Sequence, residues 1–192
     1  ARGEATLSMA SCANFAALLL LPASQAMAVT ALSSVVGEML FMRKPPRRVA
    51  FNAAQSAIAV GAAAWMFDAL GGDRTRLMEM IGTMQWAPLI GAALVYFLVN
   101  SGAVSLAVSI SDRMSLTTAW KENFGNAYEC ISSGALFSLG VLVAIHYEMA
   151  GAGATLFAAL PLVLAYAGYR HHLKLRALAE KRDGSDRMDR AA

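Results

Sequence analysis

Five polar side chains lie inside stretches of otherwise apolar sequence, where they could hold a ligand or carry a proton. They are Glu38, Asn52, Gln55, Asn100 and Glu129. Amides and carboxylates are costly in hydrocarbon unless they are hydrogen bonded, so polar residues within a membrane span are candidates for function. All five fall toward the same leaflet and could converge on one polar cluster. We favour the other interpretation, in which they form interhelical hydrogen bonds that fix helix packing.

A lone histidine is the only candidate ligand for a cofactor. His146 lies near one end of an apolar run, where an imidazole could ligate the metal of a haem or a chlorophyll. No second ligand at helical spacing supports that role. We therefore interpret His146 as an interfacial histidine beside Tyr147 and Glu148, and we predict no cofactor, although a pigment or haem contact is conceivable.

Motifs for catalysis or metal binding are absent from the sequence. It contains no Walker glycine loop and no HExxH, CxxC or GxSxG motif. Cys12 and Cys130 belong to different apolar runs, at depths that we expect to differ, so we predict two small apolar side chains rather than a disulfide. The sequence therefore predicts no catalytic residue, no metal site and no enzymatic activity.

The composition is that of an integral membrane protein. Of 192 residues, 57% are hydrophobic and only 15% are charged, and the mean hydropathy is +0.49. The net charge is only +3, and the basic residues cluster beside apolar runs rather than alternating with aromatic residues. This pattern argues against nucleic acid as a partner and favours the lipid bilayer.

Six apolar runs approach the twenty or so residues that a helix needs to cross a bilayer. Pro22 and the Pro45-Pro46 pair separate the first three runs, because proline cannot continue a helical hydrogen-bond ladder. The predicted fold is thus an all-α, polytopic bundle of about six transmembrane helices. The predicted spans are residues 5–21, 23–42, 49–70, 84–110, 128–148 and 151–169.

The first 28 residues also resemble a cleaved signal peptide. Leu18–Leu21 is a short apolar core, and Ala26-Met27-Ala28 resembles a cleavage site. We prefer a retained span, because the apolar run at residues 5–21 is followed at once by a second one.

Lysine and arginine residues give the spans a direction. Basic residues flanking a span mark the cytoplasmic side, and six alternating spans with both termini inside place every Lys and Arg except Arg74 and Arg76 on that side. We expect a multi-pass protein of the bacterial inner membrane. The residues predicted at the membrane interface are Arg43, Lys44, Arg47, Arg48, Trp120, Lys121 and Arg170.

Outside the spans, two short helices and a tail are expected. Residues 73–83 and 115–125 alternate charged and apolar positions, which predicts helices lying on the membrane surface, the second with Trp120 among the headgroups. We divide the chain into a six-span domain, residues 1–170, and a basic cytoplasmic tail, residues 171–192. The tail is predicted to be helical to about Arg182 and then disordered.

Three segments carry a family resemblance. The stretches RKPPRRVAFNAAQSAIAVGAAAW, LVYFLVNSGAVSLAVSIS and AWKENFG resemble the multi-span membrane region found ahead of HD-GYP or GGDEF signalling domains in bacteria. The resemblance covers about residues 25–180 and implies a membrane sensor. The residues that carry it are Arg43, Pro45, Phe51, Asn52, Ala54, Gln55, Tyr96, Phe97, Asn100, Trp120, Glu122, Asn123 and Phe124.

A catalytic output domain, which the resemblance implies, does not follow the last predicted span. Either such a domain was removed or the module acts through another polypeptide. Our first prediction is therefore a non-enzymatic accessory or structural subunit of a larger membrane complex, conceivably electron-transfer or photosynthetic, contacting other membrane subunits through helix faces of small residues. The alternatives are a sensory, ligand-binding input module and a substrate-capture subunit of an energy-coupling-factor type transporter.

Overall fold

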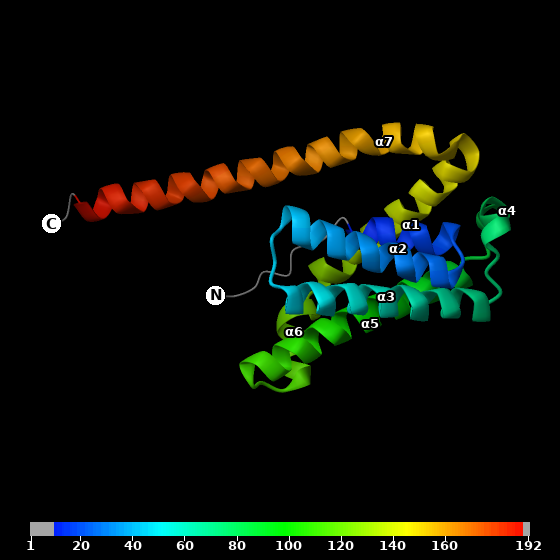
Figure 1. Ribbon diagram of the computed structural model, residues 1–192, viewed down its shortest axis with the longest axis horizontal. Coiled ribbons are helices and arrows are strands. Elements are labelled where there is room, and N and C mark those ends of the chain that lie inside the picture. The colour runs from blue at the N-terminus through cyan, green and yellow to red at the C-terminus, as the bar shows by residue number, and fades with distance from the viewer. Residues whose placement is uncertain (1–9, 190–192) are drawn as a thin grey trace. The chain divides into compact units, whose positions relative to one another are not determined.

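The computed structural model describes residues 10–189, which form helices joined by short turns and include no strand (Figure 1). The predicted all-helical fold is confirmed. The elements are α1 Ala10–Leu20, α2 Ala23–Val36, η1 Gly37–Phe41, α3 Pro46–Ala69, η2 Arg74–Arg76, α4 Leu77–Gly82, α5 Ala87–Asp112, α6 Leu116–Phe124 and α7 Ala127–Asp189.

Within these residues, three helices rather than six are long and apolar enough to cross a membrane. They are Pro46–Ala69, Ala87–Asp112 and Glu129–Ala158. The described part of the first predicted run yields α1, whose 11 residues extend about 16 Å, whereas a hydrocarbon core is about 30 Å thick. Residues 5–9 of that run lie outside the described residues. The second yields α2, which has 14 residues before the π-helical turn η1 begins. Apolar composition alone therefore overestimated the number of spans.

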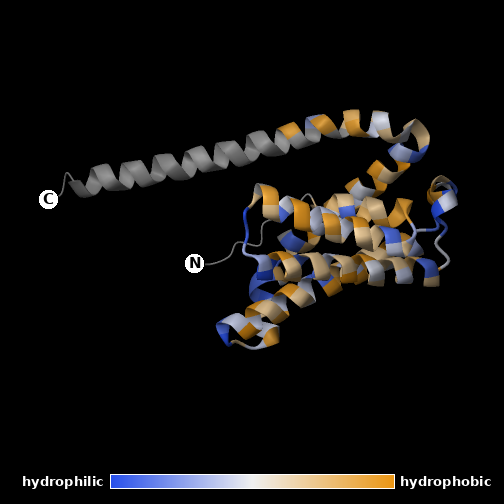
Figure 2. Ribbon diagram, in the orientation of Figure 1, coloured by the Kyte–Doolittle hydropathy of each residue, from blue (hydrophilic) through white to orange (hydrophobic). Residues whose placement is uncertain are grey.

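Helix α3 is central to the first compact unit, residues 1–145, and packs against α2 on one side and α5 on another (Figure 1). Small side chains permit this close approach, since Ala59, Ala63 and Ala64 are fully buried. Other small residues on α3 and α5 are also buried inside the chain, namely Ala53, Ser101 and Ser105. Figure 2 shows the apolar helices of the bundle and the hydrophilic turn before α3.

Both predicted short helices form. The segment after α3 folds into η2 and α4, but Leu77 and Met80 are buried in the hydrophobic core rather than lying on an outer surface. Helix α6 begins after Ser115, whose hydroxyl accepts a hydrogen bond from Thr118 N at 3.1 Å and so caps the helix.

The described residues of the second compact unit, 146–189, belong to the long helix α7, which begins at Ala127. The backbone leaves helical geometry at Gly151, where φ is 77° and ψ is 177°, and then resumes it. This break lies at the start of the last predicted span, residues 151–169. The helix extends to Asp189, whereas the sequence predicted that it would end near Arg182.

Candidate functional site

The predicted polar residues divide into two separate contacts on α3. We call the first the Glu38 cluster, which consists of Glu38, Lys44 and Asn52. Lys44 Nζ lies 2.7 Å from Glu38 Oε1, and Asn52 Nδ2 donates to both carboxylate oxygens, at 2.7 and 2.9 Å. Lys44 N also donates to Glu38 O, which folds the basic turn back over the end of α2. The cluster therefore ties the π-helical turn η1 to the first turns of α3.

The second contact, which we call the Gln55–Asn100 pair, joins α3 to α5. Gln55 Nε2 donates to Asn100 Oδ1 at 2.9 Å and to the Asn100 backbone oxygen at 3.2 Å. The Gln55 side chain is buried. The Gln55 amide thus donates twice to Asn100 between two candidate spans, and the packing role stays a prediction for this pair.

Glu129 does not join either contact. It is half-buried near the start of α7, and its backbone N–H donates to Asn126 Oδ1 at 2.8 Å. Trp120 is half-buried against α5, where its Nε1 donates to Ser101 Oγ at 3.2 Å. The Arg170 side chain lies outside the described residues. The predicted interface residues with exposed side chains are Arg43, Arg47, Arg48 and Lys121.

No metal centre is found in the part of the chain that the structure describes, since no group of three or more His, Cys, Asp or Glu side chains gathers there. His146 Nε2 has no hydrogen-bond partner among these residues. Cys12 is buried and Cys130 is exposed, and both are free thiols.

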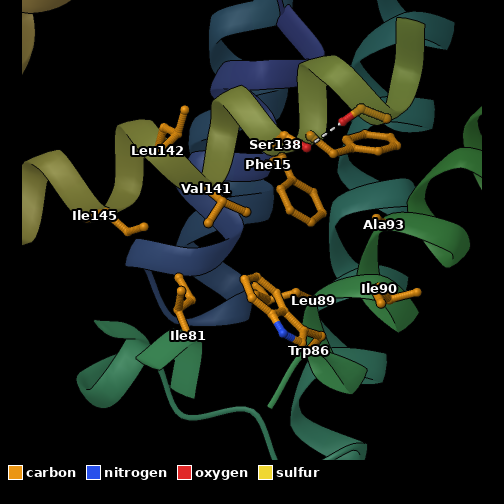
Figure 3. A pocket seen from close by; sticks show the side chains of 12 residues that line it. Phe15, Ile81, Trp86, Leu89, Ile90, Ala93, Ser138, Val141, Leu142 and Ile145 are labelled. Carbon is orange, nitrogen blue, oxygen red and sulfur yellow. Dashed lines mark hydrogen bonds between the residues drawn. The ribbon is translucent and has the colours of Figure 1, made fainter. Parts of the chain in front are cut away.

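The described residues include an apolar cavity of about 400 Å³, which we call the lateral cavity (Figure 3). Four helices form it, and all of its lining residues lie within residues 1–145. Phe15 comes from α1 and Ile81 from α4. The start of α5 contributes Trp86, Leu89, Ile90 and Ala93. Helix α7 contributes Gly134, Phe137, Ser138, Val141, Leu142 and Ile145.

Helical periodicity explains why these residues share one cavity. Positions spaced three or four residues apart lie on one face of a helix, and both α5 and α7 follow that spacing here. Gly140 lets α7 approach α1 closely, because a Cβ at this position would lie 2.8 Å from Cys12 O and 3.1 Å from Phe15 Cβ. This close approach places the α7 residues that follow Gly140, namely Val141, Leu142 and Ile145, beside the cavity that they line.

An aromatic cluster of Phe15, Tyr96 and Phe137 supports one wall of the lateral cavity. The Phe15 and Phe137 ring centroids are 5.0 Å apart, and those of Tyr96 and Phe137 are 5.4 Å apart. Asn14 Nδ2 donates to Tyr96 Oη at 3.1 Å and is buried behind this wall. Aromatic pairs of this kind contribute about 0.5 to 1.5 kcal/mol beyond their area burial, so they stabilise this wall.

Sequence reasoning missed both Asn14 and the lateral cavity. Asn14 could have been found, since it is an amide inside an apolar run and satisfies the criterion that selected Asn52. The lining of the cavity carries no comparable signal, because its apolar residues have the same composition as a surface that faces lipid.

A protein-family model, MASE9, matches residues 11–169. The match includes the Glu38 cluster, the Gln55–Asn100 pair and every residue that lines the lateral cavity. No curated protein and no solved structure matches the chain. Because the family match covers most of its length, the chain belongs to the MASE9 family of membrane-associated sensory domains.

Proposed function

We propose that the chain is the input module of a membrane signalling protein, which detects a stimulus in the bilayer and passes the response on through α7. Membership of a family of membrane-associated sensory domains is the observation that carries this proposal. It favours the sensory alternative over our first prediction of an accessory subunit in a larger complex.

The position of the lateral cavity supports a route for the signal. Half of its lining residues belong to α7, and the same helix continues to Asp189. An occupant of the cavity would therefore touch the element that leads out of the first compact unit. A ligand shifts a conformational equilibrium only through contacts that differ between two states, and contacts with α7 can supply that difference.

The output and its location are further parts of the proposal. The RKPPRR turn, the FNAAQ entry into α3 and the AWKENFG segment support an output domain of the HD-GYP or GGDEF type, on the same polypeptide or on a partner. Basic residues at 43–48 and in the tail support a cytoplasmic position for both segments in a bacterial inner membrane. The chain itself then needs no enzymatic activity.

Attaching a GGDEF-type catalytic domain after Ala192 tests this function, with cyclic dinucleotide synthesis measured in inner-membrane vesicles. Gly134→Leu fills the lateral cavity, and Gly102→Leu is a matched control, since a Cβ at either glycine meets nothing within 4 Å and Gly102 lies outside the cavity. We expect Gly134→Leu to change the rate about threefold or more and Gly102→Leu to leave it unchanged. Equal rates for the parent and both variants would contradict a sensory role for this cavity.

A further inference from the structure

We propose that the lateral cavity binds a neutral, lipid-soluble molecule with a flat, carbonyl-bearing ring, which is the chemistry of membrane quinones. This inference rests on the sensory function proposed above and identifies the class of its ligand. It is argued from the size of the cavity, the side of the molecule on which it opens, and the side chains that line it.

The lateral cavity is large enough for a ligand. Packed protein interiors contain few voids larger than a water molecule, whereas this cavity measures about 400 Å³. That volume falls within the range of about 300 to 1,000 Å³ that is typical of small-molecule sites. Part of the space exists because Gly134 and Ala93 place no bulky side chain on facing walls.

The lateral cavity opens toward lipid. Its rim residues Ile90 and Leu142 are 57% and 60% exposed, and each belongs to a helix that is long and apolar enough to cross a membrane. Trp86, also on the rim, is 45% exposed and precedes the first residue of α5, where an indole ring suits the membrane interface. A ligand dissolved in the bilayer therefore has a direct path into the site.

The lining excludes charged ligands. None of its residues carries a charge, so a carboxylate or phosphate inside would lie in a medium of low dielectric constant without a partner. Fatty acids and phospholipid headgroups are thus poor occupants. A neutral lipophile remains.

Ring stacking and one hydrogen bond favour a flat carbonyl compound among neutral lipophiles. The rings of Phe15 and Trp86 face the cavity from opposite walls (Figure 3). Trp86 Nε1 has no partner among the described residues, and it lies on the edge of the indole away from Phe15 (Figure 3). A carbonyl oxygen at the mouth of the cavity, beyond that edge, could accept a hydrogen bond from it. The Ser138 hydroxyl donates to Gly134 O at 2.9 Å, so its proton is already used. A saturated chain would use neither the aromatic walls nor the indole N–H.

Binding is measured on the full chain in lipid nanodiscs, with decyl-ubiquinone as the probe and tryptophan fluorescence as the signal. Replacing Trp65 and Trp120 by phenylalanine leaves Trp86 as the sole tryptophan. We expect saturable quenching of Trp86. A second background, Trp65→Phe with Trp86→Phe, leaves only Trp120, which lies outside the cavity and reports partition of the probe into lipid.

Cavity-filling variants then identify the binding site. Gly134→Leu, made in the Trp86-only background, is expected to weaken binding about tenfold or more, and Gly102→Leu to change it by less than about twofold. Ala93→Leu fills the site from the opposite wall and is expected to act like Gly134→Leu. Circular dichroism confirms that each variant keeps its helices, so that weaker binding is not a failure to fold.

Three results would overturn the inference. They are quenching that does not saturate, affinity that neither filling variant changes, and displacement of the probe by 1-decanol as readily as by a second quinone. The cyclic dinucleotide assay separates this inference from the proposed function. Quinone binding without any change in output would contradict the sensory function alone, whereas an output that responds to Gly134→Leu without quinone binding would contradict only the ligand class.

Discussion

At the scale of single residues, one carboxylate joins three segments of the chain. Glu38 accepts hydrogen bonds from Lys44 and Asn52, and so connects the π-helical turn η1, the basic turn and the start of α3. Polar groups in a membrane protein cost least when every partner is present. The energetic consequences of removing the acceptor and removing one donor should therefore differ.

Removing the acceptor should destabilise the protein more than removing the lysine. Glu38→Ala leaves the Asn52 amide and the Lys44 ammonium without this partner, and we expect a loss of about 1 to 3 kcal/mol in the free energy of unfolding. The Lys44 side chain is 35% exposed, so Lys44→Ala should cost only about 0.5 kcal/mol because solvent screens the ion pair. Reversible unfolding in mixed micelles measures both losses. Equal losses of unfolding free energy in the two variants would show that the hydrogen bonds from Asn52 to Glu38 add no stability.

A double-mutant cycle tests the packing role of the Gln55–Asn100 pair. Gln55→Leu, Asn100→Leu and the double variant should give a coupling free energy of about 0.6 to 2 kcal/mol, because the two amides bond each other between α3 and α5. Gln55 keeps its bond to the Asn100 backbone oxygen in Asn100→Leu, which limits the loss in that single variant. A coupling of zero would contradict the packing role.

Sequence reasoning at this scale finds polar residues but not their partners. Glu38, Asn52, Gln55 and Asn100 were selected because amides and carboxylates are rare in apolar runs, and all four form hydrogen bonds with another element. Their division into two contacts depends on the π-helical turn η1 and on the rotation of α3. Neither feature is encoded in hydropathy.

At the scale of the helices, the contact between α7 and α1 depends on a missing side chain. Gly140→Ala would put a Cβ 2.8 Å from the Cys12 backbone oxygen, which cannot move aside as a flexible side chain could. We expect this variant to lose about 1 to 3 kcal/mol of stability as α7 is displaced from α1. Gly134→Ala, on the same helix with open space around it, should instead gain about 0.5 to 1 kcal/mol from helix propensity. Thermal unfolding of both variants measures the contrast, and stabilisation of both would contradict the close approach.

The turn before α4 is held by a capping carboxylate whose titration can be observed. The Asp73 side chain accepts hydrogen bonds from the Thr75 hydroxyl at 2.7 Å and the Thr75 N–H at 2.8 Å. These bonds favour the charged form and lower the pKa of Asp73 below its ordinary value of 3.8, with Arg76 lowering it further. The charged carboxylate of Asp73 therefore stabilises the turn at pH values above the ordinary pKa. This stabilisation is lost as the pH falls through the lowered pKa.

Nuclear magnetic resonance of the Asp73 carboxyl carbon should show a midpoint below 3.8. Thr75→Val removes the hydroxyl and keeps the N–H, so it should raise the midpoint toward the ordinary value. Thr83→Val is the control, because its hydroxyl bonds Glu79 O rather than Asp73. An Asp73 midpoint that is the same in all three proteins would contradict the capping interaction.

The helices that the sequence predicted best have proline or a capping residue at their N-termini. Pro45 precedes α3 and Pro46 is its first residue, Pro88 lies in the first turn of α5, and Ser115 caps α6. The length of α2 was overestimated, because apolar composition continues where the helix changes geometry at η1. Local chemistry thus predicted where helices begin more reliably than hydropathy predicted how many cross the bilayer.

At the scale of the whole molecule, hydropathy and charge lead to different positions for the tail. Three spans would put the segment that follows them on the side opposite the turn at 43–48. The positive-inside rule instead places the basic tail on the same side as that turn, which requires the chain to cross once more.

We expect the tail to lie on the cytoplasmic side, as its charge predicts, because it carries a dense run of basic residues. In a Cys130→Ser background, Ser185→Cys should resist a membrane-impermeant maleimide in intact cells and react after permeabilisation. Arg76→Cys should react in both conditions, since Arg76 lies in the segment expected outside. Labelling of Ser185→Cys in intact cells would support three crossings and place the tail outside.

The membrane character and the sensory relationship could be predicted from the sequence, and the lateral cavity could not. An apolar composition indicates a protein that lies in lipid. Short polar motifs indicate family membership, which the family match over residues 11–169 establishes. A cavity forms where the side chains on the faces of separate helices do not fill the space between them. Composition cannot distinguish Leu142, which lines that cavity, from Leu98, which is exposed elsewhere.

The break at Gly151 determines which residue can occupy that position in α7. With φ at 77° and ψ at 177°, this residue adopts a backbone conformation that is essentially restricted to glycine, and helical geometry is interrupted there. A side chain with a Cβ would strain the backbone at this position even though there is open space around it. Glycine therefore allows α7 to consist of two helical segments instead of one continuous helix.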